Sequence, residues 1–245
     1  MAYRVIEAGQ AAHILELSQE PGSGTAPEPG EGLKGAYYLF KAIDAAEAQA
    51  FCSTLWGMAH ALRGSPGSRI TVFINSGGGE VGAGFAIIEM MYSVKRELGI
   101  PVDTVVQGYA YSMGATIFQA GDRRRMGYFS TVMLHSGTWQ VSGRDTEVFS
   151  DLKKLSDLYQ RMTAELFYRR TDLHSQEWWR RFIYSGRERY LSAQDCLKLR
   201  LVDEICQFLN ECYLPSPSPG GGVVADLVAR VPGEGIAAPL TRGEG

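Results

Sequence analysis

The sequence predicts an α/β fold, in which the strands of an open sheet alternate with helices. Two stretches carry this prediction, 70–96 and 104–120, each a β-branched apolar run followed by a small-residue loop and a helical pattern. A third strand-like run ends at His135. With 245 residues, 45% of them hydrophobic, the chain can form one such domain with extensions.

The elements are expected in this order. Residues 1–20 give a short strand and a helix, and 21–32, rich in proline and glycine, form a linker. A strand at 36–40 precedes a helix over 45–62, which Asp44 is placed to cap. Later strands lie at 70–74, from 104, at 130–134 and at 202–205, and later helices at 81–96, 115–120, 146–168, 177–182 and 192–199. We therefore assign 1–35 to an N-terminal extension, 36–210 to the main domain and 211–245 to a flexible tail.

Groups suited to chemistry follow the three central strands. Gly77, Gly78 and Gly79 follow the first, Ser112 stands at the turn after the second, and His135 follows the third. In an open α/β sheet, sites gather at the carboxyl ends of the strands. The glycines also suit a phosphate cradle, but no Gly-Lys-Ser/Thr motif follows and the next residue is acidic. The basic run 122–125 is expected to be a solvated turn.

Two interpretations of Ser112 are open. A serine at a helix start is first of all an N-cap. At a sharp strand-to-helix turn its oxygen is also exposed beside the free N–H groups of the helix, as in a nucleophile elbow. A serine nucleophile needs a base, a carboxylate that orients the base, and an oxyanion hole. The glycine loop, Ser112, His135 and a downstream acid supply these four parts.

Composition excludes several classes of protein. A formal net charge of −3 and a pI near 5.9 disfavour nucleic-acid binding. No apolar run is long enough for a membrane span, and the first residues lack a secretory signal. The histidines are too scattered for a metal site. The cysteines form no CxxC pair, so we expect reduced thiols and a cytoplasmic protein; they are Cys52, Cys196, Cys206 and Cys212.

Four short motifs occur in the same order in a known family. They are Ile74-Asn75-Ser76-Gly77-Gly78-Gly79, Tyr111-Ser112-Met113-Gly114-Ala115, Val132-Met133-Leu134-His135, and Tyr190-Leu191-Ser192-Ala193 with Leu201-Val202-Asp203. Over roughly 36–207 the chain resembles the proteolytic subunit of the ATP-dependent Clp protease, whose motifs read Asn-Ser-Pro-Gly-Gly, Ala-Ser-Met-Gly-Ala, Met-Ile-His and Phe-Leu-Ser-Ala with Gly-Leu-Val-Asp. The main domain is therefore identified as a Clp-like serine protease domain.

The resemblance implies the roles of individual residues. Ser112 would be the nucleophile, His135 the general base, and the backbone N–H groups of Gly79 and Met113 the oxyanion hole. Glu188 stands where the family has the aspartate of the triad. Its extra methylene shifts the carboxylate and could weaken the triad, and the other interpretation of Glu188 is a surface acid in a charged turn.

The resemblance also implies fold, activity and partners. The fold would be a crotonase-like spiral of β-β-α units with a protruding handle helix over 146–168. The activity would be that of a self-compartmentalised serine endopeptidase, which acts on unfolded polypeptides. The chain would assemble with copies of itself into a double heptameric ring, and its partner would be a Clp-type AAA+ unfoldase. No metal or organic cofactor is implied, because ATP is used only by the unfoldase.

Assembly and two rival functions remain open. The helix over 146–168 carries a narrow apolar seam, which suits packing on its own sheet or on another subunit: Val148, Leu152, Leu155, Tyr159, Met162 and Leu166. One rival function is a structural ring subunit whose triad is weakened by Glu188. The other is an acyl-CoA hydratase or isomerase on the related crotonase fold, in which Ser112 and His135 would have no role.

Overall fold

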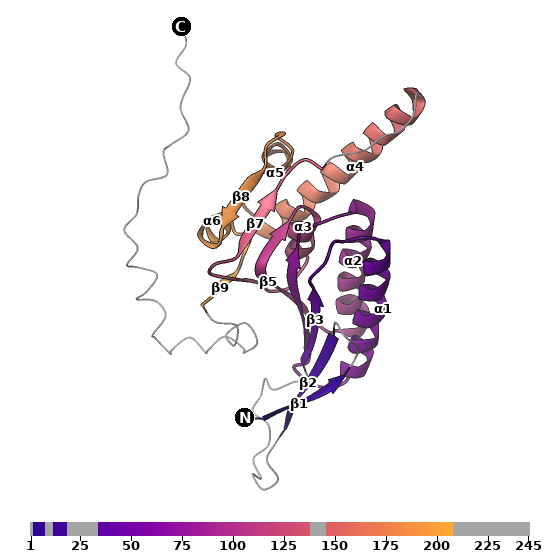
Figure 1. The fold of residues 1–245 in the computed structure, drawn as a ribbon, viewed down its shortest axis with the longest axis vertical. Coiled ribbons are helices and arrows are strands. Elements are labelled where there is room, and N and C mark those ends of the chain that lie inside the picture. Colours follow the sequence, from indigo (N-terminus) through magenta and orange to yellow (C-terminus); the bar gives the residue numbers. More distant parts are fainter. Residues whose placement is uncertain (1, 8–11, 19–33, 138–145, 208–245) are drawn as a thin grey trace, which may run out of the picture. The chain divides into compact units, whose positions relative to one another are not determined.

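The fold is α/β, as predicted. The computed structural model describes residues 2–7, 12–18, 34–137 and 146–207, and the side chains of 34–137 and 149–207. One sheet runs through these ranges (Figure 1). Its parallel centre consists of β3 (Lys34–Leu39), β4 (Arg69–Ser76), β5 (Val102–Tyr111), β6 (Arg124–Gly127) and β9 (Glu204–Cys206).

The sheet is extended at its N-terminal side. Strands β1 (Ala2–Glu7) and β2 (Ala12–Ser18) pair with each other in antiparallel fashion, and β2 pairs with β3. The prediction of a strand and a helix over 1–20 is therefore wrong. A short helix is marginal by itself, whereas a strand beside an existing edge gains a full ladder of main-chain hydrogen bonds. The predicted linker and most of the tail lie outside the described residues.

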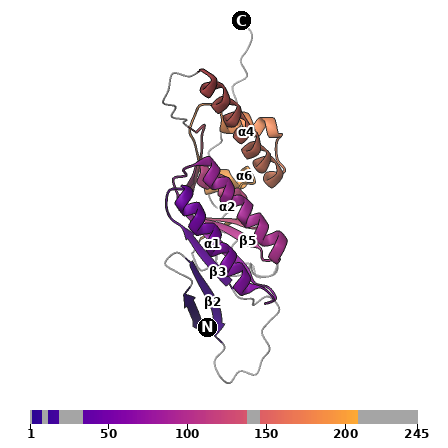
Figure 2. The ribbon, with the colours of Figure 1, turned by 90° about the vertical axis from the view of Figure 1, so that its right-hand side faces the viewer.

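Helices α1 (Ala45–Leu62) and α2 (Val81–Ser93) lie side by side against the sheet (Figures 1 and 2). The Asp44 side chain caps α1 by accepting a hydrogen bond from the Glu47 N–H at 2.7 Å, as predicted. Helix α2 continues into a π-helical turn η1 (Val94–Leu98) that ends at Gly99 with φ +70°. The two helices bury the inner face of the sheet under residues such as Phe51 and Ile87.

Strand β5 changes partner halfway along. Residues 104–106 pair with β6, whereas 109–111 pair with β7 (Thr131–Leu134). Between them lies Gly108 with φ +96°, whose N–H donates to the Ser130 Oγ at 3.0 Å. A side chain at Gly108 would be strained and would press on the Asn75 amide. This kink brings β7 beside the end of β5, and β7 pairs in turn with the antiparallel strand β8 (Arg189–Ser192).

Three helices follow along the second half of the chain. They are α4 (Thr146–Thr171), α5 (Gln176–Ile183) and α6 (Ala193–Lys198), and Ser192 and Asp195 form the predicted capping box of α6. The C-terminal turns of α4 pack into the core, where the Phe167 and Trp179 ring centroids are 5.3 Å apart. No residue of α4 between 149 and 162 is buried. Among the described residues, no helix is both long and apolar enough to cross a membrane.

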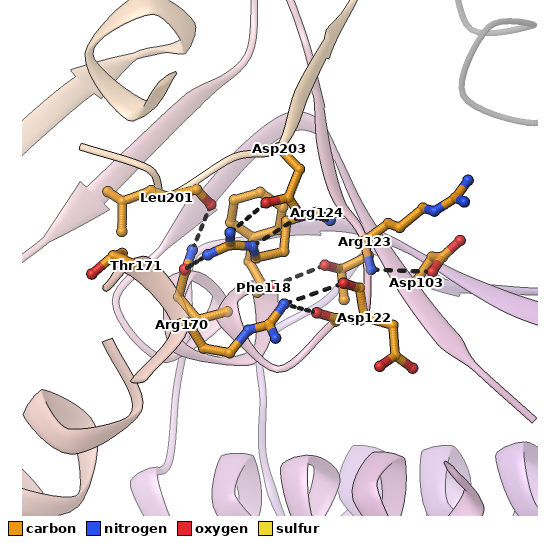
Figure 3. A network of polar contacts seen from close by, with 12 residues as sticks. Asp103, Phe118, Asp122, Arg123, Arg124, Arg170, Thr171, Leu201 and Asp203 are labelled. Carbon is orange, nitrogen blue, oxygen red and sulfur yellow. Dashed lines mark hydrogen bonds and ion pairs between the residues drawn. The ribbon is translucent and has the colours of Figure 1, made fainter. Parts of the chain in front are cut away.

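The basic run at 122–125 is a solvated turn only in its first half, where Asp122 and Arg123 lie in a bend and Arg123 is exposed. Arg124 and Arg125 open strand β6 and are about 5% exposed or less. The Arg124 guanidinium donates to both carboxylate oxygens of Asp203, at 2.5 and 3.2 Å, and to Gln119 at 2.9 Å (Figure 3). Arg125 instead faces the fully buried Asp103, with its guanidinium 3.6 Å from the carboxylate. Arg124 and Arg125 are buried because the carboxylates of Asp203, just before β9, and Asp103, on β5, neutralise them.

The cysteine prediction needs one correction. Cys52 and Cys196 are free thiols, and burial raises the pKa of Cys196 to about 12. Cys206, by contrast, is disulfide-bonded. The expectation of four reduced thiols is therefore wrong for this residue, and the cysteines no longer support a cytoplasmic compartment.

Candidate active site

Ser112 sits at a strained corner between β5 and α3 (Met113–Gln119). Its backbone has φ +53° and ψ −119°, a conformation that L-residues other than glycine rarely adopt. The corner is anchored by the Ser112 N–H, which donates to the Met133 carbonyl of β7 at 2.8 Å. The Ser112 side chain makes no capping bond to the helix. The N-cap interpretation therefore fails for the hydroxyl, which is free to point elsewhere, and strain of this kind marks nucleophile elbows.

The hydroxyl of Ser112 points to His135. The His135 Nε2 lies 2.9 Å from the Ser112 Oγ, within hydrogen-bond distance. Strand pairing explains why two residues so far apart in sequence meet. Strands β5 and β7 are parallel with Tyr111 opposite Met133, so both chains leave the sheet at the same edge. The prediction that the ends of these strands come together is confirmed.

The glycine loop after β4 closes on this pair. A Cβ built on Gly78, whose φ is +95°, would lie 2.7 Å from the Ser112 Cβ and 3.0 Å from the Met113 nitrogen. A Cβ on Gly79 would lie only 2.0 Å from the Ile43 carbonyl oxygen. Both positions therefore require glycine, and their absence of side chains lets the loop backbone reach the serine.

An oxyanion hole needs free backbone N–H groups, and the predicted donors are Met113 and Gly79. Met113 is the first residue of α3, so its N–H has no acceptor within the helix. Gly79 pairs with Ile43 through its neighbours, since Ile43 N donates to the Gly78 carbonyl and Glu80 N donates to the Ile43 carbonyl. The Gly79 N–H itself is not used in that bridge. The roles predicted for Gly79 and Met113 are compatible with this geometry and stay predictions.

Glu188 is placed close to His135 by strand pairing, but its side chain has another partner. Strands β7 and β8 are antiparallel with Leu134 opposite Arg189, so the next pair outward is His135 and Glu188. The Glu188 Oε2 accepts a hydrogen bond from the Tyr190 hydroxyl at 2.8 Å. This bond to the carboxylate is the main reason that the pKa of Tyr190 is raised. Between these described residues, no hydrogen bond joins Glu188 to His135, and its role in a triad stays a prediction.

A cavity of about 70 Å³ opens beside the serine and histidine. Polar but uncharged side chains from α3, α4 and the end of α5 form much of its wall: Thr116, Ser156, Tyr159, Gln160, Thr163 and Tyr184. Burial raises the pKa of Tyr184, so its hydroxyl stays neutral. None of the described residues in the wall is Asp, Glu, Lys or Arg. The cavity therefore suits an uncharged side chain next to the reacting group.

Sequence reasoning missed most of this wall. It considered only the apolar seam of α4, for packing on its own sheet or on another subunit, although 156, 160 and 163 recur at helical spacing with polar uncharged side chains. The apolar seam is also divided between two roles. Tyr159 stacks on Phe85 with ring centroids 5.6 Å apart, and Leu166 packs on the core. Leu155 and Met162 are exposed, and the side chain of Val148 lies outside the described residues.

Comparison with known proteins shows the family to which the chain belongs. The family model described as Clp protease matches residues 35–208. The chain belongs to the Clp protease family. It is 31% identical over 149 residues to the ATP-dependent Clp protease proteolytic subunit of Deinococcus radiodurans, which covers 60% of this chain and 69% of that protein. The resemblance drawn from the four sequence motifs is thereby confirmed, and Ser112, His135 and the glycine loop all lie within the matched Clp protease region.

Proposed function

We propose that this Clp protease family member is a serine endopeptidase. The observation that carries the proposal is the 2.9 Å contact between the His135 Nε2 and the Ser112 Oγ at a strained strand-to-helix corner. In this mechanism His135 takes the hydroxyl proton while the oxygen attacks the peptide carbonyl. The N–H groups of Gly79 and Met113 stabilise the oxyanion. The imidazolium then protonates the leaving amine, and a water molecule, activated by His135, releases the acyl group from the serine.

The proposed substrates are unfolded polypeptides. Such a chain can bind as an added strand, because main-chain pairing is nearly independent of sequence. The cavity beside Ser112 would accept one side chain of the substrate, and its wall favours an uncharged one. Neither a metal nor an organic cofactor is needed for this chemistry, since the serine, the imidazole and the backbone supply all the groups.

The proposed setting is a Clp-type complex in the cytoplasm. The crotonase-like spiral, with α4 as a handle, would form two seven-membered rings, and an AAA+ unfoldase would feed them with substrate. The exposure of α4 supports this assembly, because Leu155, Leu158 and Met162 are each more than a third exposed on one helix. Burying a few such side chains per subunit contributes about 1.5–3 kcal/mol each, before ordering costs.

Labelling with a fluorophosphonate tests the chemistry. The wild-type protein should react with the probe at Ser112 and hydrolyse a short fluorogenic peptide, because His135 activates the hydroxyl. His135→Ala should lose both reactions. His60→Ala is the matched control, since His60 is an exposed histidine on α1 and should leave both unchanged. A wild-type protein that neither labels nor hydrolyses would contradict the proposal.

Sedimentation tests the assembly. The wild type should form a particle far larger than the 26.9 kDa chain. Leu155→Glu should split it into single rings with reduced peptidase activity, because it places a charge on the exposed face of α4. Lys153→Glu is the matched control on the same helix. A wild type that is monomeric at micromolar concentration would overturn this part of the proposal.

One observation favours a second candidate function, that of a structural ring subunit. The Glu188 carboxylate is bound by Tyr190 and not by His135, so the histidine lacks the orienting acid expected of a full triad. Under this alternative the particle would assemble, but Ser112 would not label.

A further inference from the structure

The Gly78–Gly79 peptide is held by the main chain of Ile43. Its carbonyl oxygen accepts a hydrogen bond from the Ile43 N–H at 2.9 Å. The peptide is planar and trans, as all described peptide bonds are, so the Gly79 N–H points away from that carbonyl. Fixing the carbonyl therefore fixes the direction of the N–H. Any group that secures the Ile43 segment against the glycine loop controls where the proposed oxyanion donor points.

Ser76 ties these two segments together. Its side-chain hydroxyl donates to the Lys41 carbonyl at 2.5 Å and accepts from the Gly78 N–H at 3.2 Å. One hydroxyl thus joins the segment before Ile43 to the residue before Gly79. Ser76 is 1% exposed, so water cannot readily replace these bonds. Gly114 of α3 packs on Ser76, with a built Cβ 3.1 Å from the Ser76 carbonyl oxygen and 3.4 Å from the Ser76 Cβ, which leaves little room for movement.

The segment that Ser76 grips is itself rigidly attached to α1. The buried Glu47 carboxylate accepts hydrogen bonds from the Tyr37 hydroxyl at 2.9 Å and from the Lys41 Nζ at 2.7 Å. The Glu47 N–H is in turn bound by the cap residue Asp44. Lys41 and Asp44 flank Ile43 on both sides, so the partner of the glycine loop has a fixed position.

We propose that Ser76 is a positioning residue for the oxyanion hole, which aims the Gly79 N–H at the carbonyl oxygen attacked by Ser112. The inference rests on the proposed peptidase function and names a residue outside the Ser112–His135 pair. The hydroxyl touches neither the substrate nor the reacting atoms. It acts through the Gly78–Gly79 peptide, which it holds against the Ile43 segment.

Ser76→Ala, compared with Ser68→Ala, tests the proposal. Both serines are buried and close to the ends of β4, but the Ser68 Oγ has no hydrogen-bond partner among the described residues. For Ser76→Ala, kcat on a fluorogenic peptide should fall about 10- to 100-fold, because a misaimed donor loses part of the 10²–10³ that an oxyanion-hole donor supplies. KM should change less than about 2-fold, since the interaction is made in the transition state. Ser68→Ala should retain both values.

Hydrogen exchange supplies a readout that does not depend on activity. The amide of Gly78 should exchange at least about 10-fold faster in Ser76→Ala than in Ser68→Ala, because its acceptor is removed. Should Ser76→Ala not fold, Ser76→Cys carries the same two measurements, since a thiol is a weak hydrogen-bonding group of similar shape.

The outcomes separate this inference from the function it rests on. An active wild type with unchanged kcat and unchanged Gly78 exchange in the Ser76 variant overturns the positioning role alone. An inactive wild type contradicts the peptidase, and the exchange measurement then decides whether Ser76 holds the loop.

Discussion

At the carboxyl edge of the parallel strands, the residues around Ser112 are held by main-chain hydrogen bonds and close glycine contacts. At the amino edge of the same strands, ion pairs hold the sheet: Arg69 and Arg125 flank the buried Asp103, and the buried Arg124 is paired with the partly exposed Asp203. Figure 3 shows the pair of Arg124 and Asp203. Main-chain contacts fix atoms in place without adding charge beside the reacting groups. The ion pairs join neighbouring segments of the sheet and contribute to its stability. The amino edge therefore stabilises the fold, whereas the carboxyl edge fixes the positions of the groups around Ser112.

The largest expected effect is on catalysis, with an opposite effect on stability. Ser112→Ala and Ser112→Gly should both lower peptide hydrolysis by about 10³-fold or more. Ser112→Gly should nevertheless have a free energy of unfolding about 1 kcal/mol above that of Ser112→Ala, because glycine tolerates the positive φ. Peptidase assays and urea unfolding measure the two quantities. Equal stabilities would show that the corner stores no strain.

The amino edge should respond in the opposite way. Asp103→Asn removes the buried negative charge that Arg69 and Arg125 share and should lower the free energy of unfolding by about 3–5 kcal/mol. Hydrolysis per folded molecule should stay close to that of the wild type. The control is Asp151→Asn, which breaks an exposed pair with Lys154 and should cost less than about 1 kcal/mol. If Asp103→Asn lost activity without losing stability, the proposed difference between the two edges would be wrong.

Substitutions of Glu188 test whether its carboxylate orients His135 at the carboxyl edge. Glu188→Gln should lower the hydrolysis rate about 10-fold or more if the carboxylate orients His135, and Glu188→Asp should retain or raise it because it restores the family residue. Glu177→Gln, on α5, is the control, since its carboxylate pairs only with the exposed Arg181 within the described residues. A rate in the Gln variant equal to that of the wild type would remove Glu188 from the mechanism and leave Tyr190 as its only established partner.

The smallest effect concerns pH. Burial raises the pKa of Asp203, but the hydrogen bonds from Arg124 outweigh burial and hold the pKa below its ordinary value. The carboxylate therefore stabilises the fold above the unfolded-state pKa, and this contribution is lost as the pH falls through the lower folded-state value. Unfolding free energies of wild type and Asp203→Asn should differ by about 1 kcal/mol at pH 6 and converge only as the pH falls below the lowered folded-state pKa of Asp203, a small effect because the side chain is partly exposed. A difference in unfolding free energy that does not change with pH would show that ionisation of Asp203 is not its cause.

Local sequence patterns were sufficient for most of the elements and for two site residues. Helix α1 with its Asp44 cap, the capping box at Ser192, and the strands before Ser112 and His135 depend on periodicity and on side chains within a few residues of one another. Such interactions are local, so they can be recognised without the fold. The roles of Gly79, Met113 and Glu188 came from the family motifs alone and stay predictions.

Tertiary structure alone decided the contacts between distant segments. The sequence does not show that Arg124 meets Asp203, that Glu188 binds Tyr190, or that Ser76 joins Lys41 to the glycine loop. Each depends on strand register and on the kink at Gly108, which sets the partner of β5. From sequence alone a charged or polar side chain is expected to be exposed to solvent. It is buried where the fold places a hydrogen-bond or ion-pair partner beside it. For this reason the sequence determined that Ser112 and His135 follow strands of the sheet, and the packing of β4, β5 and α1 decided how the groups around them are held.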